Sequence, residues 1–212
     1  MTPFFSIIVV CLNPGEKLLQ TLQSIQKQEF RDYEIVLKDG GSTDGSLQKL
    51  YPEQSGLHVV TKPDRGIYDA MNQAVEEAKG RFVFFLNCGD WFMDEQVLAD
   101  MHDRIDGHEQ TGTEHSAIYY GNVYERVTGQ LVSSNPKLNA FGCYRNVPCH
   151  QACFYERELL LRHPFQLEYR VRADYEQFLW CFFEAKANPF YTGITVADYE
   201  GGGFSETKKN LA

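Results

Sequence analysis

Polar side chains follow four apolar runs of the sequence, at the point where each run stops. The first such site is Asn13, the second is Asp39, the third is Asp64, and the fourth extends from Asn87 to Asp90. If each run is a strand of one parallel sheet, the four sites meet beyond its carboxyl edge, where nucleotides bind in such folds. With a net charge of −9, the chain can hold a phosphate only with local help from a cation or from backbone donors. The pattern therefore predicts a nucleotide-binding edge.

The elements that must position these residues alternate between strand and helix. Residues 81–86 consist of Arg81 followed by five consecutive apolar residues, which is typical of a strand buried on both faces at the centre of a parallel sheet. Asn13 and Pro14 are expected to cap and start the first helix, and Gly80 is expected to end the helix before the fourth strand as its C′ residue. Repeated strand–helix units predict a parallel sheet with right-handed crossovers. The expected strands span residues 4–11, 34–38, 57–61 and 81–86.

A different pattern begins after residue 94. Apolar residues at helical spacing predict a helix that Gly107 closes, and alternation on both sides of Thr128-Gly129 predicts an antiparallel hairpin. Residues 135–148 are expected to be a long irregular segment. Asp174 precedes another helical stripe, which starts at Tyr175. Strands are expected at residues 117–124, 129–133, 151–155 and 191–199, within a single domain of residues 1–212 whose halves are 1–93 and 94–212.

Composition narrows the class of protein. The 212 residues are 43% hydrophobic and 14% aromatic, which indicates a packed globular chain. The acidic balance argues against a nucleic-acid partner. No apolar run reaches the roughly 18 residues of a membrane span, and the early first strand leaves no room for an export signal. We therefore expect a cytoplasmic protein with reduced cysteines, and Cys149, His150 and Cys153 do not have the spacing of a zinc site.

Six segments together resemble a known family. In chain order they are DGGSTDG at 39–45, DRGIYDAMN at 64–72, LNCGD at 86–90, HQ at 150–151, ADYE at 173–176 and GGFS at 202–205. The chain resembles family 2 inverting glycosyltransferases of GT-A fold, in particular the bacterial surface-polysaccharide members. This resemblance implies an α/β fold with a nucleotide-sugar-binding half and a smaller, antiparallel acceptor-binding half. It also implies transfer of a sugar from a UDP-sugar to a glycan or lipid-linked acceptor in polysaccharide biosynthesis.

The resemblance assigns the central roles to three aspartates. Asp174 resembles the catalytic base, which takes the proton of the acceptor hydroxyl as that hydroxyl attacks the anomeric carbon. Asp39 resembles the residue that pairs with the base of the nucleotide, since a carboxylate accepts the imide N–H of uracil. Asp90 resembles the last acidic residue of the metal motif and would hold manganese or magnesium on the diphosphate. In this chain Asn87 and Gly89 replace the other aspartates of that motif.

The remaining assignments follow the same resemblance. The donor side would contain the other loop and helix residues at the strand ends, namely Asn13, Gly41, Asp64, Arg65, Tyr68, Asn72 and Asn87. The acceptor side would contain Trp91, His150 and Gln151. Structural roles stay open beside these: an Asx turn for Asp39, helix caps for Asp90 and Asp174, loop bracing for Asn72, a solvated Arg65, a structural His150 and core packing for Trp91.

Two other functions compete with the enzyme. A catalytically silent nucleotide-sugar-binding or scaffold protein would explain the degenerate motif at 87–90. A nucleotidyltransferase is less compatible, because the first loop has no glycine-rich start with paired Arg and Lys. Lipid-linked acceptors lie at the inner face of the membrane, so peripheral membrane contact is a further hypothesis. The donated sugar, the acceptor, the linkage and the oligomeric state stay open.

Overall fold

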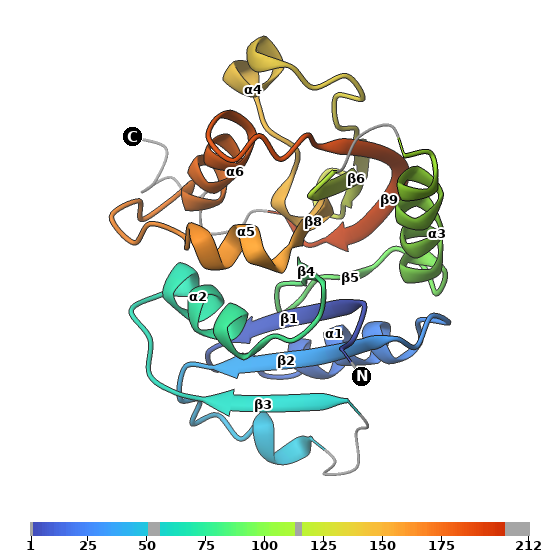
Figure 1. The fold of residues 1–212 in the computed structure, drawn as a ribbon. Helices are drawn as coiled ribbons and strands as arrows, with labels where there is room; N and C mark the ends of the chain where they lie inside the picture. The colour runs from blue at the N-terminus through green and yellow to red at the C-terminus, as the bar shows by residue number, and fades with distance from the viewer. Residues whose placement is uncertain (1, 51–55, 113–115, 202–212) are drawn as a thin grey trace.

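One curved sheet organises the computed structural model, which describes residues 2–50, 56–112 and 116–201 (Figure 1). Its strands are β1 (Phe5–Cys11), β2 (Tyr33–Asp39), β3 (Leu57–Thr61), β4 (Phe82–Phe85), β5 (Trp91–Phe92), β6 (Ile118–Glu125), β7 (Gln130–Val132), β8 (Cys153–Glu156) and β9 (Phe190–Tyr199). The α-helices are α1 (Lys17–Gln26), α2 (Ile67–Glu77), α3 (Val97–Gln110), α4 (Ala140–Arg145), α5 (Arg157–Arg162) and α6 (Ala173–Phe183). Two 3₁₀ turns, η1 (Leu47–Lys49) and η2 (His150–Ala152), complete the described elements.

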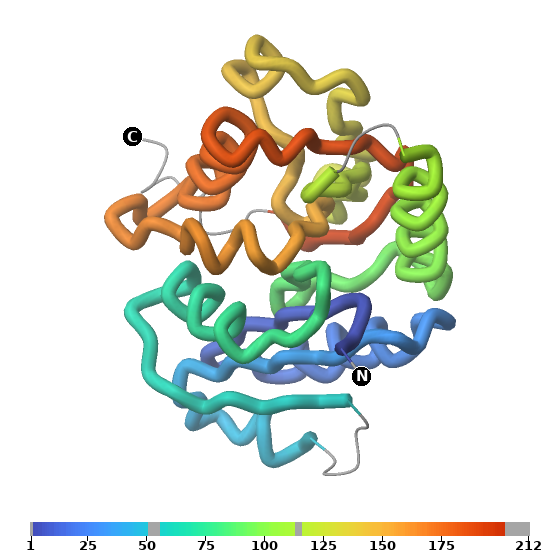
Figure 2. The backbone as a smooth tube through the Cα atoms, in the orientation of Figure 1, coloured from blue at the N-terminus to red at the C-terminus, as the bar shows by residue number. Residues whose placement is uncertain are grey.

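The strand order is β3-β2-β1-β4-β8-β6-β9-β5, with β7 paired to β6. The first four strands in this order run parallel, which confirms the prediction for the first half. The expectation that β4 lies between parallel neighbours is wrong, because β8 pairs with it antiparallel. β4 is thus the strand at which the parallel half meets the mixed half. The same sheet therefore contains strands from both halves of the chain, whose backbone path can be followed in Figure 2.

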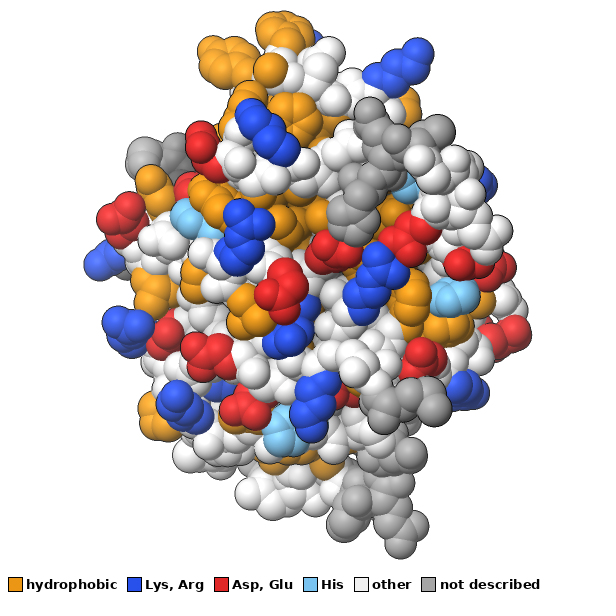
Figure 3. Space-filling model, viewed as in Figure 1, with side chains coloured by type: hydrophobic (Ala, Val, Ile, Leu, Met, Phe, Trp, Pro, Cys, Tyr) orange, Lys and Arg blue, Asp and Glu red, His pale blue; other side chains and the backbone are white. Residues whose placement is uncertain are grey.

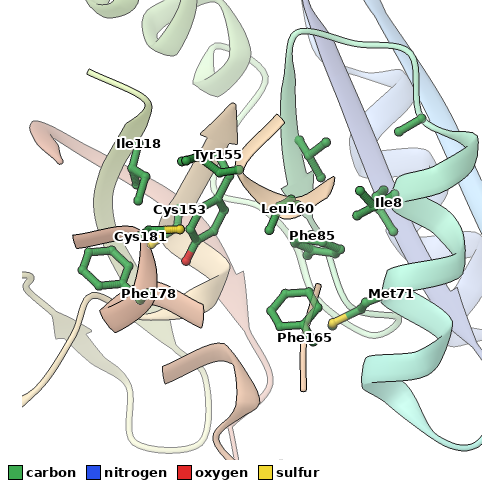
Figure 4. Close-up of a cluster of buried hydrophobic side chains, with 14 of the residues drawn as sticks. Ile8, Met71, Phe85, Ile118, Cys153, Tyr155, Leu160, Phe165, Phe178 and Cys181 are labelled. Atoms are coloured by element: carbon green, nitrogen blue, oxygen red, sulfur yellow. The ribbon is translucent and has the colours of Figure 1, made fainter. Parts of the chain in front are cut away.

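Alternate residues of the central strands face two separate cores, as the period of a strand requires. Ile8 and Phe85 belong to one core with α2, α5 and α6, whereas Ile7 and Phe84 belong to the other with α1 and α3. Figure 4 shows the first core, in which Phe85 and Met71 lie close to Phe165. Helices on both faces explain why the run at 81–86 contains no polar alternation. These two cores hold the carboxyl ends of β1 to β4 in fixed positions.

The structure corrects several expected boundaries in the first half. Asn13 does not cap α1, because it has a φ of 49° and the helix starts only at Lys17. Gly80 is not a left-handed C′ residue. A Cβ on Gly80 would lie 2.5 Å from the backbone nitrogen of Ser6, so close packing is the reason for glycine here. Close packing and long-range contacts therefore set these two positions.

Boundaries in the second half also differ from the expected ones. α3 continues past Gly107 to Gln110, and residues 135–148 contain α4, whose first turn is capped by the side chain of Asn139. α5 and β5 were not expected. α6 begins at Ala173, so Asp174 lies inside its first turn and is not the residue that caps it. The segment GGFS at 202–205 lies outside the described residues.

Candidate active site

The loops after β1 and β2 are joined by hydrogen bonds that involve two of the predicted donor-side residues. The Asn13 backbone N–H donates to Ser42 Oγ at 2.7 Å, and Asn13 Oδ1 accepts from the Thr43 N–H at 2.8 Å. Asp39 is 1% exposed, and its carboxylate accepts from the N–H groups of Gly41 and Ser42 at 3.1 and 3.0 Å. Asp39 therefore forms the Asx turn that was open as an alternative. Pairing of Asp39 with a nucleotide base stays a prediction.

A buried lysine that sequence reasoning overlooked lies between the second and third sites. Lys38 is fully buried, and its ammonium donates to Asp64 Oδ2 at 2.9 Å, Lys62 O at 2.6 Å and Asp39 O at 3.1 Å. Asp64 Oδ1 accepts from the Gly66 N–H at 3.1 Å. Lys38 thus holds the loop after β3 against the loop after β2. The sequence did contain a signal for this buried lysine, because Lys38 directly follows the apolar residues 35–37 of the predicted strand.

Two residues predicted on the donor side use their polar groups within the protein. Arg65 has a side chain that is 77% exposed and pairs with Asp69, one helical turn further along the chain. Asn72 donates to Phe165 O and accepts from the Phe165 N–H, both at 2.9 Å. The amide of Asn72 therefore ties α2 to the segment after α5, which is the bracing role named as its alternative.

Asp174 lies in the first turn of α6 and meets a side chain from the first half of the chain. The Tyr68 hydroxyl donates to Asp174 Oδ1 at 2.8 Å. Burial, with the nearby Asp174 charge, raises the pKa of Tyr68 above its usual value, so the phenol stays protonated and keeps donating. The start of α6 also places the carboxylate near the positive end of the helix dipole. The arrangement can hold an oriented carboxylate base.

His150 lies beside this carboxylate and is 8% exposed. Its ring stacks on Phe85 with centroids 4.9 Å apart and meets the edge of Phe165 at 5.8 Å. Neither ring nitrogen has a hydrogen-bond partner among the described residues. Burial lowers the pKa of His150, and the Asp174 charge opposes that shift only in part. His150 is therefore a neutral imidazole fixed between aromatic rings, with both ring nitrogens buried and unpaired in the described structure.

Asp90 is 5% exposed and lies at the end of β4, as expected, but it does not cap a helix. Its Oδ1 accepts from the Glu200 N–H at 2.9 Å, and the chain continues into β5. Burial raises the pKa of Asp90 to about 6, with smaller effects of Arg126, Glu200 and Asp198 that partly cancel. Burial therefore makes the ionised carboxylate less stable here than it is in water.

The residues around Asp90 could hold a cation only if other ligands, such as diphosphate oxygens or waters, complete its coordination. Across residues 2–50, 56–112 and 116–201, no three His, Cys, Asp or Glu side chains form a group that could hold a metal ion. Asn87 Oδ1 is buried and has no partner in the described structure. Magnesium and manganese commonly keep several waters and few protein ligands. One carboxylate and one amide oxygen at this strand end are thus compatible with such a cation.

The other predicted acceptor-side residues, Trp91 and Gln151, each make their own contact within the protein. The Arg126 guanidinium stacks over Trp91 at 3.4 Å from the ring centroid and binds Asp198 at 2.7 Å. The Arg126 guanidinium therefore covers one face of the Trp91 ring. Gln151 accepts from the Cys149 thiol at 2.9 Å. Hydrogen bonds thus connect two groups of predicted residues: Asn13, Asp39, Gly41 and Asp64 at the ends of the parallel strands, and Tyr68 with Asp174. His150 is not bonded to the second group, but the Asp174 charge acts on its ring.

Known proteins resemble the chain in sequence and in fold. The model of glycosyl transferase family 2 matches residues 6–162. A PGL/p-HBAD biosynthesis glycosyltransferase of Mycobacterium tuberculosis is 36% identical over 211 residues, which cover 97% of this chain and 80% of that protein.

Two solved structures have a similar fold. S. aureus TarS in complex with UDP has a TM-score of 0.74 at 22% identity, over 92% of this chain and 60% of that one. The mannosyltransferase PcManGT from Pyrobaculum calidifontis, in complex with GDP-Man and Mn2+, has a TM-score of 0.55 at 18% identity, over 78% and 48%. The chain therefore spans less than two thirds of either solved chain.

Proposed function

The chain belongs to glycosyl transferase family 2, and on this basis we propose that it transfers a sugar from a UDP-sugar to a glycan or lipid-linked acceptor, with inversion at the anomeric carbon. The predicted family and GT-A fold are confirmed. The observation that carries the proposed mechanism is the hydrogen bond between Tyr68 and Asp174, 2.8 Å long. It joins the segment resembling the donor site to the carboxylate that resembles the base. The UDP in the solved TarS complex supports the choice of nucleotide.

Asp174 performs the proton transfer in the proposed reaction. The acceptor hydroxyl oxygen forms the new bond to the anomeric carbon while the bond from that carbon to the diphosphate oxygen breaks, and the hydroxyl proton moves to Asp174. Tyr68 occupies Oδ1 of this carboxylate, which leaves Oδ2 for the hydroxyl. His150, neutral because burial lowers its pKa, would lie on the acceptor side of Asp174.

Asp90 and Asn87 would hold the divalent cation, manganese or magnesium, which is proposed as the cofactor. When bound, this cation would neutralise the charge of the departing nucleoside diphosphate. The Mn2+ in the solved PcManGT complex supports this choice. Asp90→Asn is expected to weaken the dependence of UDP affinity on manganese, measured by calorimetry at several manganese concentrations. An unchanged dependence would remove Asp90 from the metal site.

The decisive experiment is Asp174→Asn, with Glu176→Gln as the matched control. Glu176 lies in the same first turn of α6, but its carboxylate binds His163 at 2.9 Å. Asp174→Asn should abolish release of UDP from the donor in the presence of acceptor while leaving UDP affinity intact, and Glu176→Gln should keep most of the activity. Retention of activity in Asp174→Asn would refute the assignment of the base.

A silent nucleotide-sugar-binding protein is the second candidate, favoured by one observation. The motif at 87–90 keeps a single carboxylate, and Asp90 Oδ1 already accepts the Glu200 N–H. Donor binding by calorimetry without turnover on any acceptor would support this candidate. For the enzyme, we propose a cytoplasmic location with a lipid-linked acceptor at the inner face of the membrane. No helix in the described part of the chain has the length and apolar character of a membrane span.

A further inference from the structure

The short helix α4 exposes two aromatic side chains on one face. Phe141 is 68% exposed and Tyr144 is 81% exposed, and residues three apart are neighbours on a helix surface. The opposite side of α4 is anchored, since Cys143 is fully buried and Leu138 packs against the core beside α6. Large aromatic groups that a well-fixed helix presents to solvent in this way mark an interaction surface.

The charge around these aromatic residues has the opposite sign to that of the whole chain. Residues 127–155 contain no Asp or Glu, although the chain has 29 acidic residues and a net charge of −9. The same stretch carries the exposed basic residues Lys137 and Arg145, one on each side of the aromatic pair. Figure 3 shows hydrophobic and basic side chains gathered at the end of the molecule where Figure 1 places α4. This positive, aromatic surface complements a negatively charged partner.

The shape of this region favours a flat partner over a small ligand. α4 projects at one end of the molecule, opposite the edge strand β3, in the ribbon and in the tube (Figures 1 and 2). Phe141 and Tyr144, which belong to α4, therefore lie at this projecting end. Aromatic rings lie at the interface between lipid headgroups and acyl chains, and lysine or arginine beside them is attracted to anionic lipid. A membrane surface satisfies both features together.

α4 is connected directly to the catalytic helix. The Tyr175 hydroxyl donates to Cys143 O at 2.7 Å, and Tyr175 follows Asp174 in the sequence. On the other side of this region, the Tyr120 hydroxyl, on β6, donates to Asn135 O at 2.7 Å. A surface that contacts α4 therefore lies close to the helix that carries Asp174, and two tyrosine hydroxyls hold the backbone of this region in place.

We propose that Phe141 and Tyr144, with Lys137 and Arg145, form a docking surface for an anionic membrane, and that this surface presents Asp174 to a lipid-linked acceptor. Only the second part rests on the proposed function. The aromatic rings enter the headgroup region, while the two cations lie against lipid phosphates. Docking then places the α6 end of the site toward the membrane, and the sheet edge at β3 faces away.

The test measures binding of the whole protein to vesicles without donor or acceptor, so that it is independent of glycosyl transfer. Flotation is performed with vesicles of phosphatidylcholine alone and with vesicles that contain a third phosphatidylglycerol. Binding is expected only to the anionic vesicles and is expected to weaken with added salt. Phe141→Ser combined with Tyr144→Ser should weaken it by about ten-fold or more, because both rings leave the apolar layer.

Charge variants provide the matched comparison. Lys137→Glu with Arg145→Glu should weaken binding by roughly 25-fold or more, since each basic residue near an anionic surface contributes about a factor of five. Lys27→Glu with Lys79→Glu changes the net charge equally at exposed positions in the other half of the chain, and should weaken binding much less. Val59→Ser, an exposed apolar residue on β3, is the control for the aromatic pair.

Three results would overturn the docking surface. The first is that the protein does not bind anionic vesicles, and the second is that it binds neutral vesicles equally well. The third is that the control variants lose as much vesicle binding as the variants of the docking surface. Thermal unfolding of each variant verifies that it is folded. If Asp174→Asn stayed active while α4 variants lost vesicle binding, the proposed base would fail and the docking surface would stand. The reverse outcome would leave the enzyme and remove the membrane surface.

Discussion

Lys38→Met should destabilise the protein strongly, because it removes a cation that is enclosed by three acceptors. The Lys38 side chain is fully buried, and that of its partner Asp64 is 11% exposed. Breaking a buried ion pair by removing one member costs about 3–5 kcal/mol, since the other charge stays buried without compensation. Asp64 keeps the Gly66 N–H, and Asp39 O keeps the Lys62 N–H, so these contacts soften the loss. We therefore expect a decrease of about 3 kcal/mol in the free energy of unfolding.

Urea unfolding of four proteins measures this effect: the wild type, Lys38→Met, Asp64→Asn and the double variant. The double variant removes both members of the buried ion pair and should recover at least about 1.5 kcal/mol relative to Lys38→Met, which appears as a coupling energy in the cycle. Lys62→Met is the control, because Lys62 is exposed and contributes only its backbone to this cluster. It should change the free energy by less than about 0.5 kcal/mol.

The same variants test whether the cluster shapes the donor site. If Lys38 holds the loops after β2 and β3 together, Lys38→Met should weaken UDP binding, and Lys62→Met should do so much less. A free energy of unfolding for Lys38→Met within about 0.5 kcal/mol of the wild type would refute the reasoning. So would a double variant that is less stable than either single variant.

Three further outcomes follow from other contacts of the site. Tyr68→Phe removes the hydroxyl that orients Asp174 and should lower kcat by roughly ten-fold or more with UDP affinity unchanged, in steady-state kinetics and calorimetry. Burial raises the pKa of Asp90 from 3.8 to about 6, so its contribution to stability is lost as the pH rises through about 6. Metal-free Asp90→Asn should therefore gain up to about 3 kcal/mol at pH 8 and nothing below about pH 4, measured by urea unfolding. Gly40→Ala places a Cβ 2.8 Å from Asp64 Oδ2 and should weaken UDP binding in calorimetry by displacing that carboxylate.

Where local pattern determines structure, the sequence was sufficient. The strand expected at 57–61 is β3 to the residue. The predicted strand at 4–11 differs from β1 by one residue at its start, and the one at 34–38 differs from β2 by one residue at each end. Uninterrupted apolar residues between polar turns specify a buried strand without information from distant segments. The convergence of the strand ends followed from that alone.

Where distant contacts determine structure, the sequence was misleading. Asn13 before Pro14 has the local features of a helix cap, but its amide and backbone bind residues 42 and 43 in the next loop, and the helix starts later. Lys38 has partners 24 and 26 residues away, so its burial could not follow from neighbouring residues. Both errors concern polar groups satisfied across loops, which hydrophobic periodicity does not describe.

The relation between Tyr68 and Asp174 shows why the candidate site belongs to both halves of the chain. The two residues are 106 positions apart, and they meet because α2 and α6 cover the same face of the sheet, over one hydrophobic core. Burial, with the Asp174 charge, keeps the Tyr68 phenol protonated, so the bond persists throughout the neutral range of pH. A carboxylate with one oxygen held by a fixed donor presents its other oxygen in a defined direction, which favours in-line attack over random encounter. Because Tyr175 also ties α6 to α4, that direction is set relative to the aromatic tip as well as to the donor edge.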